Sequence, residues 1–514
     1  MLKSSGAMAG ATLTSRVLGM VREICYARFM GDGVVAGAFM LAFMIPNLFR
    51  RLLGEGALTA AFIPLFKTKE KTEGEAAAWR AANAVLSALV VAAAVLVGVV
   101  LLGVSLALHW GEWGGKTALM LELLRWMFPY MLLICLTAVF MGMLNARGHF
   151  FVPALGACLM NVVMIVAVLV FAPRLSGGLE GQVFALAVGV LVAGVAQLGF
   201  QLPWLRREGF RWRWVSPWRD GTVREVAAKM VPGAVGVAAF QINMVVTQGM
   251  GFWVGDHVVA SYTYAVRLME VPQGVFGASL AAFLLPALAG LAAEKKGGEF
   301  KATLREGLGH LVFVHVLMTV LLMTLAEPIV RLLFESGKFG ADATRRAAFA
   351  LVCLAPGLLA FSSVHIFARA FYSMGDVKTP MKLSLVCLGL NVAVALALVF
   401  RFPEGREQGA FGIANAVSST VNVGLLVWWL RQRVGGLGLW AWAGRLWGVL
   451  PAAIAAAAVA WGLSGRFGNA DLGAQLAAVF VPMVAAGGVY FVVTWLAAVP
   501  SARELGRWLG GRSD

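Results

Sequence analysis

Charged residues are scarce in this sequence: Asp, Glu, Lys and Arg make up 13% of its 514 residues, whereas a soluble domain has roughly a quarter. Hydrophobic residues make up 60%, and the mean hydropathy is +0.82. This balance excludes an ordinary soluble protein and predicts an integral membrane protein. Apolar segments of about 20 residues recur along the chain, and 81–108 has no charge at all. They favour membrane-spanning helices and exclude a β-barrel.

Catalytic and metal-binding motifs are also missing. The five cysteines stand singly in apolar segments without a CxxC spacing, and the six histidines are dispersed. The sequence has no HExxH, nucleophile elbow or P-loop. We therefore expect a transporter and not an enzyme, with no metal and no cofactor. Because no ATP-binding motif occurs, the membrane potential or an ion gradient would have to drive transport.

The net charge of +16 is explained by topology and not by a nucleic-acid partner. We predict fourteen helices, and if the N-terminus is cytoplasmic, most Lys and Arg fall in cytoplasmic loops and tails, as the positive-inside rule requires. Both termini are therefore predicted to be cytoplasmic. The spans are 5–30, 35–66, 78–108, 118–146, 151–172, 182–205, 226–252, 257–291, 306–326, 344–373, 379–400, 408–431, 444–464 and 473–499.

An internal repeat divides these helices. Gly31-Asp32-Gly33-Val34-Val35-Ala36 recurs as Gly255-Asp256-His257-Val258-Val259-Ala260, and Gly148 and Pro153 recur as Gly375 and Pro380, at offsets of 224 and 227 residues. An even number of spans per copy means that both copies enter the membrane in the same direction. The predicted fold is thus all-α, with six-helix repeats at 1–218 and 219–435 around a central cavity. Two additional helices and a cytoplasmic tail follow at 436–514.

Arginine outnumbers acid inside the predicted spans. Eight arginines (Arg16, Arg22, Arg28, Arg50, Arg51, Arg125, Arg267, Arg369) stand against four acids (Glu23, Glu55, Glu122, Glu270). Charges within a membrane are costly unless they face water or a partner. Helical spacing suggests three local pairs, Arg16 with Glu23, Arg51 with Glu55, and Arg267 with Glu270. About four positive charges would remain, which predicts a water-filled, cationic cavity between the halves.

Such a cavity suits an anionic substrate, and the planar guanidinium fork suits phosphate in particular. Arg28 and Arg369 lie near span ends, where they can extend to the interface, and Arg125 lies near Glu122, so we favour a structural role for these three. Prolines at 46, 64, 272 and 286 are expected to bend the second and eighth spans.

Several motifs are specific to one family. Ser15-Arg16-Val17-Leu18-Gly19 with Arg22-Glu23, and Pro46-Asn47-Leu48-Phe49-Arg50-Arg51 with Glu55-Gly56-Ala57, resemble signatures of the MurJ/MviN family of lipid II flippases. This family belongs to the multidrug/oligosaccharidyl-lipid/polysaccharide exporter superfamily. The second half continues the resemblance with Arg267-Leu268-Met269-Glu270-Val271-Pro272 and with Arg369-Ala370-Phe371-Tyr372.

The resemblance implies transport of lipid II, an undecaprenyl-pyrophosphate-linked peptidoglycan precursor, from the cytoplasmic to the periplasmic leaflet of a bacterial inner membrane by alternating access. It assigns substrate binding to Arg16, Arg22, Arg50, Arg267 and Ser15, with Glu23, Arg51, Glu55 and Glu270 as supporting charge partners. The partners expected are lipid II, membrane lipids and cell-wall synthesis proteins.

Three alternatives stay open at this point. A flippase for another polyprenyl-pyrophosphate glycan, such as an O-antigen or capsule unit, would need the same cavity charge. A cation or drug antiporter predicts an acidic cavity, which the excess of arginine disfavours. A non-transporting membrane scaffold for cell-wall enzymes predicts that neutralising Arg16 or Arg267 leaves function intact.

Overall fold

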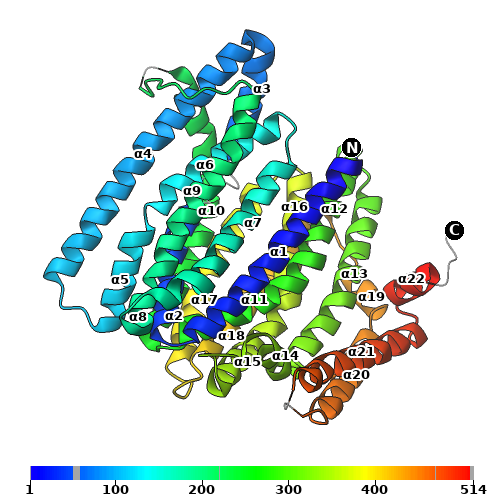
Figure 1. The fold of residues 1–514 in the computed structure, drawn as a ribbon. Helices are drawn as coiled ribbons and strands as arrows, with labels where there is room; N and C mark the ends of the chain where they lie inside the picture. Colours follow the sequence, from blue (N-terminus) through cyan, green and yellow to red (C-terminus); the bar gives the residue numbers. More distant parts are fainter. Residues whose placement is uncertain (1, 50–57, 219, 469–470, 510–514) are drawn as a thin grey trace. The chain divides into compact units, whose positions relative to one another are not determined.

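The computed structural model describes residues 2–49, 58–218, 220–468 and 471–509, and every regular element within these ranges is a helix. Backbone contacts divide the chain into two compact units, Met1–Val259 (unit 1) and Ala260–Asp514 (unit 2). Unit 1 contains α1 (Leu2–Met30), α2 (Val34–Phe49), α3 (Leu58–Glu73), α4 (Glu75–Trp110), α5 (Gly115–Met127), α6 (Tyr130–Ala146), α7 (Phe151–Val166), η2 (Ala167–Phe171), η3 (Ala172–Arg174), α8 (Gly178–Gln182), α9 (Phe184–Arg207) and α10 (Gly221–Val254) (Figure 1).

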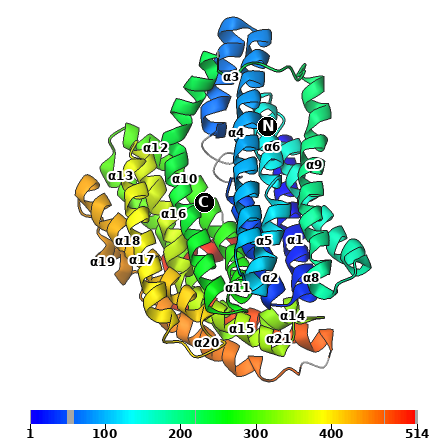
Figure 2. The same ribbon diagram turned by 90° about the vertical axis from the view of Figure 1, so that its left-hand side faces the viewer.

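Unit 2 begins two residues into α11 and is also helical throughout its described residues. It contains α11 (Val258–Pro272), η4 (Gln273–Gly277), α12 (Ala278–Ala293), α13 (Gly297–Thr324), α14 (Ala326–Phe334), α15 (Ala341–Leu354), η5 (Ala355–Gly357), α16 (Leu358–Ser373), α17 (Lys378–Val399), α18 (Gln408–Val434), α19 (Leu439–Gly444), α20 (Val449–Ser464), α21 (Leu472–Leu496) and α22 (Pro500–Leu509). Helices α17 and α18 run side by side (Figure 2).

Helices occupy the positions of all fourteen predicted spans. Among the described residues, nine are long and apolar enough to cross a membrane, and the α5–α6 pair, bent by 41°, would make a tenth. The other four predicted spans fall on α1, on α2 with α3, on α10 and on α20. Residues 50–57, between α2 and α3, lie outside the described part of the chain. The predicted all-α membrane fold is therefore confirmed.

Proline interrupts the predicted span 257–291. A π-helical turn, η4, follows Pro272 directly. Proline has no N–H to donate to the carbonyl four residues earlier, so the regular hydrogen-bond ladder is already broken at this point. The turn brings the chain close to its neighbours at Gly277, where an added Cβ would lie 2.6 Å from Ser362 Oγ. Only glycine fits this approach without a shift of the surrounding side chains.

The hydrophobic cores of the two units use corresponding helices. In unit 1 the core lies among α3, α4, α6 and α9 and includes the fully buried rings of Phe62, Phe66 and Phe210. In unit 2 it lies among α12, α13, α16 and α18 and includes Phe371 and Leu430. These are the second, third, fourth and sixth spans of each predicted repeat.

One turn recurs in both units with the same hydrogen bonds. Between α6 and α7, the His149 N–H donates to the Leu144 carbonyl at 2.9 Å, and Gly148 has φ 86°. Between α16 and α17, 227 residues later, the Asp376 N–H donates to the Phe371 carbonyl at 3.0 Å, and Gly375 has φ 78°. The left-handed φ explains why glycine stands at both places. The repeat boundaries at 218 and 435 themselves stay a prediction.

Each turn is tied to the end of the sixth span of its repeat, with the basic and acidic residues exchanged. In unit 1, His149 Nε2 lies 2.8 Å from Glu208 Oε1 at the end of α9. In unit 2, Arg433 Nη2 in the last turn of α18 lies 2.8 Å from Asp376 Oδ2. The basic group thus lies on the turn in one unit and on the helix end in the other.

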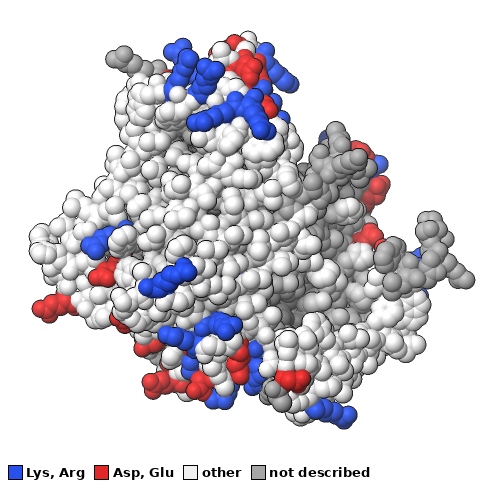
Figure 3. All heavy atoms as spheres, viewed as in Figure 1, with Lys and Arg blue, Asp and Glu red and all other residues white. Residues whose placement is uncertain are grey.

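The α3–α4 turn lies at one end of unit 1 in both ribbon views. Charged side chains gather at this end, and uncharged surface extends below it (Figure 3). Arg147 connects this end to the α6–α7 turn. Its guanidinium lies 2.8 Å from Glu70 and 2.5 Å from Glu75, and it stacks on the Trp79 ring at 5.0 Å.

The two additional C-terminal helices form a hairpin within unit 2. Helices α20 and α21 lie side by side and pack against α13 and α14 (Figure 1). The buried Tyr490 hydroxyl of α21 donates a 2.8 Å hydrogen bond to the Phe313 carbonyl of α13. The hairpin is therefore anchored through a group that would be costly to bury without a partner.

Asp376 provides a pH-dependent test of the unit 2 turn. Burial alone would raise the pKa of this carboxyl, but hydrogen bonds from the Thr379 amide and hydroxyl and the charge of Arg433 outweigh burial and lower the pKa. Because the folded pKa is depressed, its contribution to stability is complete above the unfolded value of about 3.9 and is lost as pH falls through the folded value.

We expect Asp376→Asn to lower the apparent unfolding temperature in detergent at pH 7, by on the order of 2 °C. The difference from the unchanged protein should shrink as the pH is lowered past 4. Glu404→Gln, at an exposed acid of the same unit, is the matched control and should have no such effect. A difference that stays constant with pH would contradict the role of the ionised carboxylate.

Candidate substrate-binding site

Arg16 lies on α1 as an exposed guanidinium in an apolar environment. Its helix neighbours Leu13 and Val17 are 63% and 56% exposed. Among the described residues, no carboxylate lies within ion-pair distance of Arg16. A guanidinium in this position needs water or an anionic ligand, because lipid cannot solvate it.

Arg22 and Glu23 form a largely buried ion pair on the same helix. Arg22 Nη2 lies 2.5 Å from Glu23 Oε1, their side chains are 15% and 6% exposed, and the guanidinium stacks over the Tyr26 ring at 5.4 Å. The pair expected between Arg16 and Glu23 is therefore wrong. Seven residues place two side chains about 10.5 Å apart along a helix, whereas Arg22 is adjacent to Glu23.

Asn161 of α7 positions the part of α1 that contains Ser15 and Arg16. The sequence patterns did not predict a role for this residue. Its side-chain amide is buried and donates a 3.1 Å hydrogen bond to the Ser15 carbonyl, and Gly19 lies against the same side chain. The sequence feature that could have indicated this role is a single side-chain amide within an apolar span. Ser15 itself is only partly exposed, so its main-chain contact with α7 positions Arg16 one residue later.

Arg267 lies on α11 in unit 2 with the partner that the sequence predicted. Its Nη1 lies 2.8 Å from Glu270 Oε2, and the two side chains are 36% and 43% exposed. Tyr262 of the same helix accepts a 2.5 Å hydrogen bond from the Asn415 side chain of α18. Arg267 is thus a half-exposed cation that shares its charge with the Glu270 carboxylate.

Three further predicted site residues, Arg50, Arg51 and Glu55, lie outside the described residues. The described arginines therefore come from two helices, α1 of unit 1 and α11 of unit 2. In chemical terms they offer planar, permanently charged hydrogen-bond donors that suit the oxygen atoms of a phosphate or pyrophosphate.

The Gly-Asp motif that marks the internal repeat also forms polar side-chain contacts within unit 1. The sequence pattern alone predicted only the repeat. Asp32 is buried and lies 3.7 Å from His257 Nδ1. Asp256 lies 2.9 Å from Lys116 Nζ, which also stacks on the Phe252 ring at 4.6 Å. These pairs join the α1–α2 turn and α5 to the end of α10, and no local sequence pattern predicts contacts over such separations.

Comparison with known proteins gives consistent matches over most of the chain. A family model described as "Lipid II flippase MurJ" matches residues 26–480. A probable lipid II flippase MurJ of Vibrio cholerae is 32% identical over 440 residues, which cover 83% of this chain and 82% of that protein. The lipid II flippase MurJ of Burkholderia cenocepacia is 33% identical over 437 residues, with 83% of each chain covered.

Solved structures show the same fold at lower sequence identity. A lipid II flippase MurJ in an inward closed conformation matches with a TM-score of 0.74 and 18% identity, covering 97% of this chain and 99% of that one. An inward-facing multidrug transporter of the MATE family matches with a TM-score of 0.67 and 15% identity, over 84% of this chain and 98% of that one.

The Arg22–Glu23 pair can be tested by removing one or both charges. Glu23→Gln leaves a largely buried guanidinium without its nearest counter-charge, and we expect a loss of on the order of 3 kcal/mol in the free energy of unfolding. The double variant Arg22→Gln/Glu23→Gln should lose less, because neither charge is then left buried alone. The measurement is thermal or denaturant unfolding in detergent.

Arg28→Gln, at an exposed arginine of the same helix, is the control and should stay close to the unchanged protein. If Glu23→Gln proves as stable as the double variant, Glu23 does not compensate the Arg22 charge.

Proposed function

This chain belongs to the MurJ family of lipid II flippases, and from that premise we propose that it carries lipid II from the cytoplasmic to the periplasmic leaflet of a bacterial inner membrane. The family consists of transporters, so the chain is a transporter and not an enzyme. In this proposal two parallel repeats, 1–218 and 219–435, alternate between states that open to either side.

We further propose that Arg16, Arg22 and Arg267 bind the pyrophosphate of lipid II in a cationic cavity, together with Arg50 and with Ser15 beside them. The observation that carries this assignment is Arg16, an exposed guanidinium within an apolar helix with no carboxylate partner among the described residues. Pyrophosphate supplies the compact negative charge that this group lacks.

The carboxylates set how tightly each arginine can hold its substrate. Glu270 competes with an anion for the half-exposed Arg267, so it weakens binding and favours release. Glu23 keeps Arg22 in place within α1 while Arg16 stays available. Two differently compensated sites suit a carrier, which has to bind its substrate on one side and release it on the other.

Both termini would be cytoplasmic, since the basic loops at Lys67–Arg80 and Arg206–Arg219 then face the cytoplasm. Undecaprenyl-linked substrate and surrounding membrane lipids are the proposed partners, together with cell-wall synthesis proteins. A flippase for another polyprenyl-pyrophosphate glycan remains the alternative with the same site chemistry.

The direct test is translocation of labelled lipid II by the purified protein in proteoliposomes. The unchanged protein should move lipid II, whereas Arg16→Ala and Arg267→Ala should each slow transport about tenfold or more, because a charge-assisted contact to the pyrophosphate is lost. Arg401→Ala, at an exposed arginine in the α17–α18 loop, is the matched control and should transport normally.

Each other outcome has a distinct meaning. Full activity of folded Arg16→Ala and Arg267→Ala variants would make these arginines structural. A protein that is inert toward lipid II but moves another pyrophosphate-linked glycan would retain the site and change the substrate. Inactivity toward every such substrate would favour a scaffold.

The driving force can be measured in the same vesicles. We propose that no cofactor takes part and that the membrane potential or an ion gradient supplies the energy, which for the potential is about 2.3 kcal/mol per elementary charge at 100 mV. An imposed potassium diffusion potential of one sign should then accelerate lipid II movement, and the opposite sign should slow it. Rates that respond to neither sign nor to an imposed proton or sodium gradient would exclude this coupling.

A further inference from the structure

A pocket with charged side chains in its lining lies in unit 2 and does not include the arginines of α1 and α11. It is formed by residues 302–310 in the first half of α13, by α19 with the residues after it, and by α22, and it has a volume of about 370 Å³. One water molecule occupies about 30 Å³ in the liquid, so the pocket is far larger than a single water site. The pocket can therefore hold a small polar headgroup.

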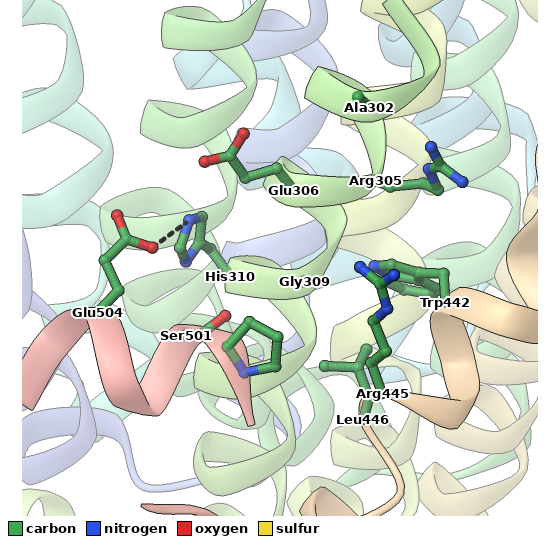
Figure 4. Close-up of a pocket in the computed structure, with 11 residues that line it drawn as sticks. Ala302, Arg305, Glu306, Gly309, His310, Trp442, Arg445, Leu446, Ser501 and Glu504 are labelled. Carbon is green, nitrogen blue, oxygen red and sulfur yellow. Dashed lines mark ion pairs between the residues drawn. The ribbon is translucent and has the colours of Figure 1, made fainter. Parts of the chain in front are cut away.

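The charges of this pocket are separated into two sides (Figure 4). Arg305 and Arg445 lie with Trp442 on one side, and Glu306, His310 and Glu504 lie on the other. Neither arginine has a carboxylate within ion-pair distance among the described residues. On the acidic side, His310 Nε2 lies 3.4 Å from Glu504 Oε2, and ligand atoms of all three residues lie within 4.8 Å of one another.

Neutral donors lie between the two sides. An added Cβ at Gly309 would lie 3.8 Å from both the Trp442 indole nitrogen and the Ser501 hydroxyl, so these two groups flank the same point of α13. Ser501 is buried, and the missing side chain at Gly309 leaves the space open. Two guanidinium groups, an indole N–H and a hydroxyl form a donor set that suits phosphate oxygens.

The wall formed by α22 is held in a defined position. The turn before it places Ala498 at φ 59°, a conformation that non-glycine residues rarely adopt. Gly506 then packs directly on the Trp495 ring of α21, where an added Cβ would lie only 1.7 Å from the ring. The position of α22, and with it this wall of the pocket, is therefore fixed by contacts with the C-terminal hairpin.

Exposed apolar side chains continue from the pocket along α20. Trp447, two residues after Arg445, is 64% exposed, and Leu450 and Ile454 of α20 are 69% and 64% exposed. Tryptophan at this place is typical of the interface between headgroups and hydrocarbon. A second pocket of about 350 Å³, lined by apolar residues of η4, α12 and α13, shares His310 with the first and offers space for a hydrocarbon chain.

We propose that this pocket binds a bilayer phospholipid with a primary amine in its headgroup, of the phosphatidylethanolamine type. The phosphate contacts Arg305, Arg445, Trp442 and Ser501, and the ammonium group contacts Glu306 and Glu504. An anionic headgroup would satisfy only the basic side. A trimethylated ammonium would fit the charge but could donate no N–H to the carboxylates. The pocket shares no residue with the proposed lipid II site, and this proposal does not depend on that one.

Native mass spectrometry of the full-length protein in detergent tests the proposal, with phosphatidylethanolamine, phosphatidylglycerol and phosphatidylcholine offered separately in the presence of EDTA. We expect phosphatidylethanolamine to bind about tenfold more tightly than the other two. Arg305→Gln/Arg445→Gln should lose this binding by about tenfold. Glu306→Gln/Glu504→Gln should keep phospholipid binding but lose the preference for the primary amine.

Arg466→Gln, at an exposed arginine in the α20–α21 loop of the same unit, is the matched control and should bind lipid like the unchanged protein. Gly309→Leu fills the pocket without removing a charge and should also lose binding, so a double arginine variant that fails to fold leaves the proposal testable. Equal binding of all three lipids, or unchanged binding in Gly309→Leu, would overturn it.

Two further experiments distinguish phosphatidylethanolamine from other ligands that the same side chains could bind. If inorganic phosphate displaces phosphatidylethanolamine as well as soluble glycerophosphoethanolamine does, the pocket takes free phosphate and not a lipid. If lipid binding requires a divalent cation and disappears in EDTA, the carboxylates and His310 hold a metal ion, and the ammonium assignment is wrong. Binding that survives EDTA and is displaced only by the complete headgroup supports the proposal.

Discussion

The cost of placing a guanidinium within an apolar helix constrains much of this protein. The chain meets that cost in three different ways. Arg22 is largely buried and paired with Glu23, Arg267 is half exposed and paired with Glu270, and Arg16 is exposed without an acid partner among the described residues. The three arrangements give one largely buried pair, one shared charge and one charge that is open to water or to an anionic ligand.

The repeats show which features of a turn the fold needs. Gly148 and Gly375 keep the same left-handed conformation, and the same main-chain bonds close both turns. A contact between a basic and an acidic side chain ties each turn to a helix end, and the two residue types are exchanged between the units. A left-handed φ demands a particular residue, whereas such a contact can be made with either residue on the turn. The two copies could therefore diverge in charge and keep their geometry.

The C-terminal hairpin combines a structural role with a surface of its own. Tyr490 anchors α21 to α13, and the turn at Ala498 with the contact between Gly506 and Trp495 directs α22 back toward α13. The result is a pocket in which arginines and carboxylates stay apart. Among the described residues neither arginine of the pocket has a carboxylate within ion-pair distance, and this separation favours a ligand that itself carries both charges.

The sequence by itself determined the membrane class, the helical fold, the family and the Arg267–Glu270 pair. These follow from hydropathy, from motifs and from spacing along one helix, all of which are local properties. Only the tertiary structure decided that Glu23 pairs with Arg22 and that Asn161 holds Ser15. It alone also brought Asp32 to His257 and assembled the pocket of α13, α19 and α22. Those contacts depend on side-chain direction and on helices far apart in the chain, and hydrophobic periodicity specifies neither.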